Sequence, residues 1–291
     1  MIADEAYALT KLKQIGYFAL IGGYKAPFRN PTARKYRDGT TFEEIVALYE
    51  FDETLRALFL QYILHIEKNL RSLLSYFFTE KYGESQEAYL TAENFADVPF
   101  WREGIEELLG KLDVLAKQNT DYAYINYQRE QYRNVPLWAL VQALPFGALS
   151  HFYKFLTDDL RTKVAKNFPH VNRRQLRQFL VVVNQYRNVC AHSERLFSHR
   201  TSKDIPDMPM HVNLGIQTDG AQYVCGKHDL FALVIAFRYL LSAEACDAFA
   251  EQLQSVLATY LASPLAVTET ELYCCMGFPT NWRDVFDCGK T

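Results

Sequence analysis

Hydrophobic residues recur at three- and four-residue steps along most of this chain, the spacing of helices that bury one face. The clearest stripe lies within residues 52–81, where Leu55, Phe59, Ile66 and Leu70 fall on one side of a helix that stops before Gly83. The same kind of pattern predicts shorter helices over residues 4–14, 42–50, 86–93, 101–117, 173–192, 228–241 and 243–262. The fold is therefore expected to be all-α.

Glycine, proline and capping residues set the predicted boundaries. "IGYFALIGGYKAPFR" interrupts the first helix, and Pro145 with Gly147 divides "PLWALVQALPFGALSHFYKFL" into two short helices that meet at a corner. Thr40 or Thr41 is placed to cap the helix that starts at residue 42, and Asn172 the helix that starts at residue 173.

The segment from 201 to 226 has a different character, because its prolines and the "TDG" sequence indicate a loop with a small hairpin near residues 210–225. No linker separates domains. We therefore expect one domain over residues 1–291, with a helical core at about 41–200, an N-terminal extension and a C-terminal helical extension at about 227–291.

Composition restricts the class of protein. The net charge of −3 excludes a globally basic nucleic-acid binder, so any such site is a local patch. No uncharged apolar run has membrane-spanning length, the start has no apolar signal core, and the six cysteines include no CxxC pair. These features predict a cytoplasmic protein with reduced thiols, no membrane partner, no metal site and, without a P-loop or GxGxxG motif, no cofactor.

Arg187, in "RNVCAH" at residues 187–192, falls among apolar residues on the helical wheel. With Leu176 at zero, Phe179, Leu180 and Val183 form an apolar stripe, and Arg187 lies at about 20°, within that stripe. Burying a guanidinium without partners costs on the order of several kcal/mol. Arg187 is therefore expected either to pair with a carboxylate or to line a cleft or a subunit interface.

A structural ion pair is the simpler interpretation of Arg187, with Glu67, near Arg71, as the candidate partner. The functional interpretation adds His192 and Asn188. His192 lies at about 160° if the helix continues, too far round to share a face with Arg187. If the helix ends or loosens near Cys190, His192 swings back beside Arg187.

The chemistry of these side chains suits RNA cleavage. A histidine exchanges protons near neutral pH, and an arginine holds a phosphate with two hydrogen bonds and stabilises the charge of the transition state. RNA supplies its own nucleophile, the 2′-hydroxyl. The expected products are a 2′,3′-cyclic phosphate and a 5′-hydroxyl, with no metal required.

"RNVCAH" resembles the R-x4-H motif of HEPN ribonucleases. "IGYFALIGGYKAPFR", "HIEKNLRSLLSYFFTEKYG", "PLWALVQALPFGALSHFYKFL", "YRNVCAHSERLF" and "MGFPTNWRDV" are similar, in this order, to blocks of the Abi family of AbiD/AbiF-like abortive infection proteins. The chain departs from the family at Gln142, where an acidic residue is common, and at Ser198 or His199, where an asparagine is common.

The resemblance implies an all-α HEPN-like bundle and a homodimer whose two motifs form one composite active site. It implies phage defence by RNA cleavage, with Arg187, His192 and Asn188 as catalytic residues, Glu67 and Arg71 as supporting residues, and a regulatory RNA or antitoxin as restraint. The alternative is a non-catalytic HEPN-like module that binds RNA or protein, in which the motif is structural.

Two further segments carry candidate binding residues. Arg173, Arg174 and Arg177 open the motif helix and are either an RNA-binding patch, which Arg195 would extend, or a solvated helix face. "DYAYINYQREQYRN" at 121–134 interleaves tyrosines with arginines. Its tyrosines either stack bases or, as we expect first, are half-buried against a core.

Overall fold

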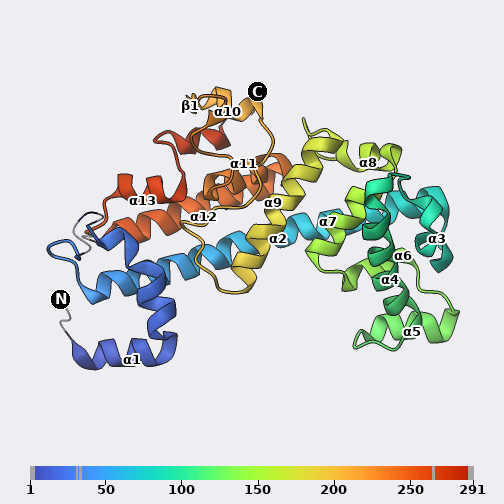
Figure 1. The fold of residues 1–291 in the computed structure, drawn as a ribbon, viewed down its shortest axis with the longest axis horizontal. Coiled ribbons are helices and arrows are strands. Elements are labelled where there is room, and N and C mark those ends of the chain that lie inside the picture. Colours follow the sequence, from blue (N-terminus) through green and yellow to red (C-terminus); the bar gives the residue numbers. More distant parts are fainter. Residues whose placement is uncertain (1–3, 31, 33–34, 264–265, 288–291) are drawn as a thin grey trace. The chain divides into compact units, whose positions relative to one another are not determined.

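Helices make up nearly all of the regular structure in a computed structural model of the chain, which describes residues 4–30, 32, 35–263 and 266–287 (Figure 1). The prediction of an all-α fold is confirmed. Residues 288–291, at the end of the expected C-terminal extension, lie outside the described residues.

The chain forms two compact units. Unit 1 contains residues 1–62 and 185–291, and unit 2 contains residues 63–184. The elements of unit 1 are α1 (Glu5–Ile15), η1 (Phe18–Gly22), η2 (Ala26–Phe28), α10 (Pro209–Asn213), β1 (Thr218–Asp219), β2 (Gln222–Tyr223), α11 (Leu230–Leu240), α12 (Ala243–Leu261), α13 (Glu269–Met276) and η6 (Trp282–Phe286). The single domain over residues 1–291 stays a prediction.

Unit 2 is a group of shorter helices. Its elements are α3 (Gln86–Leu90), η3 (Ala92–Asn94), η4 (Pro99–Trp101), α4 (Arg102–Lys117), α5 (Ala123–Tyr132), α6 (Leu137–Leu140), η5 (Val141–Ala143), α7 (Phe146–Phe155) and α8 (Asp158–Ala165). Helix α4 contacts α3, α5, α6 and α7. Phe78, Phe95 and Phe152 pack ring against ring in its core.

Two long helices contribute to both units. Helix α2 (Phe42–Tyr82) leaves unit 1 after Tyr62, and α9 (Arg173–Ala191) enters unit 1 at Gln185. Both begin with the reciprocal hydrogen bonds of a capping box. Thr41 Oγ1 accepts from Glu44 N at 3.2 Å, and Asn172 Oδ1 accepts from Gln175 N at 3.0 Å. Of the two candidate caps for α2, Thr41 is therefore the one used.

The predicted division of α2 near residue 51 is wrong. Residues 42–82 form one continuous helix, and Phe51 and Asp52 are both buried within it. The charged sequence "ETLR" after Asp52 resembles a helix boundary, but no glycine or proline is present to end the helix. As shown below, Asp52 is buried because distant parts of unit 1 satisfy its carboxylate.

The region from 201 to 226 contains the predicted hairpin. Strands β1 and β2 pair antiparallel, with Thr218 opposite Tyr223 and Asp219 opposite Gln222. The turn between them contains Gly220 at a φ of +61°, a conformation that favours glycine. The short helix α10 in the same region was not anticipated from the sequence.

The tyrosines at the start of α5 and along it contradict the expectation that they are half-buried. Tyr122, which caps α5, and Tyr124, Tyr127 and Tyr132 within it are all exposed, and Ile125 is the buried residue of this helix. A helix of ten residues buries one narrow face, and here an isoleucine occupies it. None of the helices in the described ranges is long and apolar enough to cross a membrane.

Candidate functional site at the end of helix α9

The "RNVCAH" sequence forms the last turn of α9 and its cap. His192 N donates to Asn188 O at 2.9 Å, so the helical hydrogen bonds continue beyond Cys190. Glu194 N then donates to Val189 O at 3.0 Å, and Ser193 N to Cys190 O at 3.4 Å. This is the Schellman pattern, with Ser193 in the left-handed position at a φ of +56°.

The regular helix keeps Arg187 and His192 apart within one chain. Five residues of α-helix separate their directions by about 140°, whereas Asn188 and His192 differ by only about 40°. The loosening near Cys190 that would bring the histidine beside the arginine is absent from this described turn. Asn188 and His192 therefore share one face of α9, and Arg187 points elsewhere.

Burial follows the same division. In these last turns the buried residues are Tyr186, Val189 and Cys190, and the exposed residues are Asn188, Ala191 and His192. Arg187 is half-buried and lies at the border between the two sets, not in the middle of an apolar face. The buried stripe of α9 is wider than the sequence predicts, because it includes Tyr186, Val189 and Cys190.

The guanidinium of Arg187 is incompletely satisfied. Its Nε is buried and has no hydrogen-bond partner among the described residues. Glu67, the partner offered by the sequence, forms its ion pair with Arg71, one turn on in α2. Arg71 also donates to Leu144 O at 2.9 Å, so Glu67 and Arg71 support the corner between η5 and α7 within unit 2.

A buried carboxylate fixes the chain that follows the motif. Asp52 is fully buried and accepts from Leu196 N at 2.8 Å, from Phe197 N at 2.7 Å and from Tyr24 Oη at 2.7 Å. Arg56 donates to the same carboxylate at 2.9 Å. These four donors make Asp52 the centre of what we call the Asp52 cluster.

The Asp52 cluster also reaches the helix cap itself. Arg56 donates to the carbonyl oxygen of Glu194 at 3.3 Å and to Tyr24 Oη at 3.0 Å. Burial raises the pKa of Tyr24, and the neighbouring Asp52 carboxylate raises it further, so its hydroxyl stays protonated as a donor. The cluster thus holds residues 194–197, directly after His192, in one position.

The Asp52 cluster is not apparent from the sequence, although one signal of it is present. Asp52 and Arg56 are four residues apart on a helix face that also carries Leu48, Leu55 and Phe59, and a charged pair there needs buried partners. Those partners are Tyr24, 28 residues earlier, and Leu196 and Phe197, 144 and 145 residues later, all beyond the reach of a local pattern.

Other residues secure the same segment. Arg195, a predicted RNA-binding residue, is exposed but donates to Gly23 O at 2.6 Å, which ties the motif loop to the N-terminal segment. The ring of His199 packs edge-on against Tyr186 at 5.4 Å, and burial lowers the pKa of His199.

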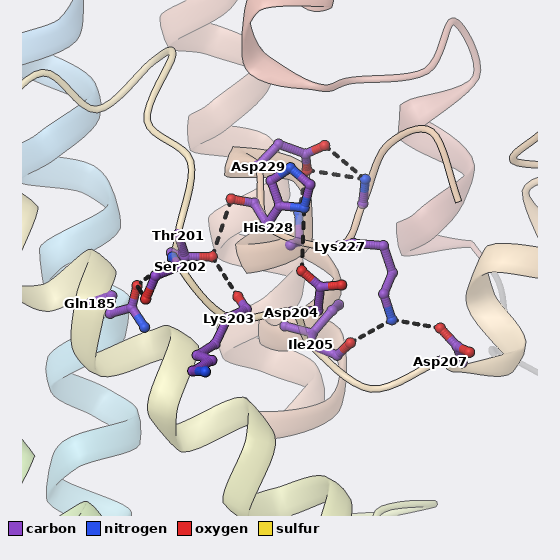
Figure 2. Close-up of polar contacts among 12 residues, drawn as sticks. Gln185, Thr201, Ser202, Lys203, Asp204, Ile205, Asp207, Lys227, His228 and Asp229 are labelled. Carbon is purple, nitrogen blue, oxygen red and sulfur yellow. Dashed lines mark hydrogen bonds and ion pairs between the residues drawn. The ribbon is translucent and has the colours of Figure 1, made fainter. Parts of the chain in front are cut away.

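The loop from 201 to 207 returns the chain to α9. Figure 2 shows Ser202 N and Oγ donating to Gln185 Oε1, and Thr201 bonded to the carbonyl oxygen of His228. Tyr186 Oη donates to that same carbonyl at 3.2 Å. His228 Nδ1 lies 3.3 Å from Asp204 Oδ1 at the surface of this loop. Residues 201, 202 and 228 therefore hold the turn of α9 that carries Gln185 and Tyr186, directly before Arg187.

The remaining predicted site residues belong to unit 2. Arg173 pairs with Asp158 at 2.9 Å, Arg174 is exposed, and Arg177 is exposed beside Trp101. No three or more His, Cys, Asp or Glu side chains are grouped to hold a metal ion within the described ranges.

Comparison with known proteins identifies the family. The Abi-like protein family matches residues 10–198, which include the Asp52 cluster, Arg187, Asn188 and His192. The resemblance of "MGFPTNWRDV" to the family lies beyond this match and stays a prediction. No curated protein and no solved structure matches the chain. Because the match covers well over half of its length, the chain belongs to the Abi-like protein family.

Proposed function

We propose that this chain is an abortive-infection endoribonuclease that cleaves RNA without a metal ion. His192 accepts the proton of the 2′-hydroxyl, Arg187 holds the scissile phosphate, and Asn188 orients it. RNA damage in an infected cell would stop growth before a phage spreads. Membership of the Abi-like family supports the defence role, and the geometry of α9 supports the chemistry.

The observation that carries the proposal is the state of the three side chains. Asn188 and His192 are exposed one turn apart at a rigidly capped helix end, where solvent and substrate reach them. Arg187 is half-buried and its Nε has no hydrogen-bond partner among the described residues, so its guanidinium keeps the capacity to bind an acceptor. An RNA phosphate would supply the missing acceptor.

The divergence of Arg187 and His192 favours a composite site formed by two copies of the chain. A single phosphate needs both groups, and one regular helix turns them about 140° apart. A twofold axis beside the end of α9 would bring Arg187 of one copy toward His192 of the other. We therefore place the proposed site at a homodimer interface.

The reaction at such a site is a transesterification. The 2′-oxygen forms a bond to phosphorus while the bond from phosphorus to the 5′-oxygen breaks. His192 of one copy takes the 2′-hydroxyl proton beside Arg187 of the other copy, a water molecule donates a proton to the departing 5′-oxygen, and His192 then releases its proton to solvent. Arg187 stabilises the additional negative charge on the phosphoryl oxygens.

An RNase of this kind requires restraint in uninfected cells, and a regulatory RNA or an antitoxin protein would provide it. The alternative function is a HEPN-like module that binds RNA or protein without cutting it. The divergence of Arg187 and His192 favours this alternative if the chain acts as a monomer.

The test is a cleavage assay on total cellular RNA in EDTA, with mapping of the cut ends. We expect wild type to leave 2′,3′-cyclic phosphates, His192→Ala to be inactive and Arg187→Lys to be strongly impaired, because a lysine cannot make two hydrogen bonds to one phosphate. His170→Ala, an exposed histidine outside the motif, is the matched control. Equal cutting by wild type and both motif variants would refute the proposal.

A further inference from the structure

Three cations gather around one aromatic ring of unit 2. The ring of Trp101, at the end of η4, lies 5.1 Å from Arg161 Cζ, 5.7 Å from Arg177 Cζ and 5.8 Å from Lys154 Nζ. These cations come from α8, α9 and α7. Phe100, next to Trp101, is 91% exposed. We call Phe100, Trp101, Lys154, Arg161 and Arg177 the Trp101 surface.

The charges of this surface are not balanced. Asp158 pairs with Arg161 and with Arg173, which accounts for one cation of the surface. Lys154 and Arg177 have no acidic partner in the described part of the chain. Burial lowers the pKa of Lys154, and the positive charge of Arg177 lowers it further. An anion placed between Lys154 and Arg177 would relieve this repulsion.

The cations are held in place before any ligand binds. Lys154 Nζ lies 4.8 Å from the centre of the Phe155 ring, and Phe155 packs against Trp101 at 6.1 Å. A side chain at Gly104 would clash with Phe155, since its Cβ would lie 2.6 Å from the ring. Cations fixed against aromatic rings lose little conformational freedom when they bind a phosphate.

We propose that the Trp101 surface binds single-stranded RNA. A base stacks on the exposed ring of Phe100, and the backbone phosphate beside it lies between Lys154 and Arg177. Two neighbouring cations without acidic partners favour a polyanion over a protein as the ligand. Bases inside a duplex are already stacked and cannot stack on a protein ring, so the RNA is single-stranded. The inference rests on the proposed ribonuclease function, and it identifies unstructured segments as the part of the substrate that the enzyme holds.

The test measures binding without cleavage. The full chain carrying His192→Ala is titrated into a labelled single-stranded RNA, and anisotropy is followed over a range of salt concentrations. Adding Phe100→Ala should weaken binding by about fivefold or more, since each stacked base contributes about 1–3 kcal/mol, and should leave the salt dependence unchanged. Adding Lys154→Ala with Arg177→Ala should reduce the slope of log K against log salt by about 0.7, because both cations contact the same phosphate.

The chain offers matched controls. Lys111→Ala with Lys117→Ala removes the same charge from cations that are already paired with Glu107 and Asp113. Tyr76→Ala removes an aromatic ring that is 61% exposed, elsewhere in unit 2. Both controls should bind RNA as the His192→Ala chain does. Circular dichroism of every variant checks that it folds.

The outcomes for the Trp101 surface are separate from the outcome for RNA cleavage. If Phe100→Ala binds normally, or if the control lysine pair weakens binding as much as the Lys154 and Arg177 pair, the Trp101 surface does not hold RNA. Equal affinity for duplex RNA also overturns the stacking role of Phe100. Cleavage by wild type is measured separately, so RNA binding lost through Phe100→Ala supports the surface even where wild type proves unable to cut.

Discussion

Replacing Asp52 with alanine should destabilise the protein more than any surface change. The substitution leaves Arg56, which is 4% exposed, without a carboxylate and leaves the N–H groups of Leu196 and Phe197 without their acceptor. Removing one partner of a buried ion pair costs about 3–5 kcal/mol. Since whole domains are stable by only about 5–15 kcal/mol, we expect Asp52→Ala to remove a large part of the stability of unit 1.

Urea unfolding followed by circular dichroism measures this loss. Glu50→Ala is the matched control, because Glu50 lies on the same helix but pairs with Lys11 at an exposed site, where a pair contributes less than about 1 kcal/mol. Arg56→Met should fall between the two, since three neutral donors remain on the carboxylate of Asp52. If the two units unfold in separate steps, the step of unit 1 should shift.

A loss for Asp52→Ala no larger than that for Glu50→Ala would refute the reasoning. It would mean that water reaches Arg56 and the freed N–H groups, so the Asp52 cluster does not hold residues 194–197. In that case the position of the chain after His192 would need another explanation.

Three further predictions concern the motif and its surroundings. Mixing inactive Arg187→Ala and His192→Ala chains should restore part of the RNA cleavage, because a mixed dimer contains one Arg187 and one His192 across its interface; no recovery would contradict the composite site. Stability should fall between pH 7.5 and 5.5, because burial lowers the pKa of His211 below the value near 6.5 of the unfolded chain, so protons bind the unfolded state first. The melting temperature measured across this pH range checks the prediction, and in His211→Gln the melting temperature should depend less on pH. Burial raises the pKa of Cys190 to about 12, so an alkylating reagent at pH 8 should modify it only after unfolding; rapid modification of the folded protein would contradict the packing of α9.

Local patterns in the sequence predict much of this fold. The stripe through Leu55 and Phe59 and the caps at Thr41 and Asn172 are properties of neighbouring residues, and the structure confirms them. The break predicted near residue 51 is wrong because the outcome there depends on contacts between residues far apart in the chain. A charged residue looks like a helix boundary until its distant partners are known, and those of Asp52 are Tyr24, Leu196 and Phe197.

The candidate site shows the same limit. The sequence locates Arg187, Asn188 and His192 on the last turn of a helix, and the helix is where it was predicted. Sequence spacing does not reveal whether that turn stays regular. The Schellman cap at Ser193 settles this within one chain, because it fixes His192 away from Arg187. The cations around Trp101 come from three helices, so spacing along a single helix identified only Arg177.

The order of synthesis gives the two-part architecture a further consequence. Unit 2 is one continuous stretch of chain, whereas unit 1 joins residues before 63 to residues after 184. A ribosome delivers the N-terminus first, so Asp52 must wait for Leu196 and Phe197 before its carboxylate is satisfied. The turn that we propose cuts RNA therefore acquires its support late in translation, and an incomplete chain still on the ribosome would carry an unformed, harmless motif.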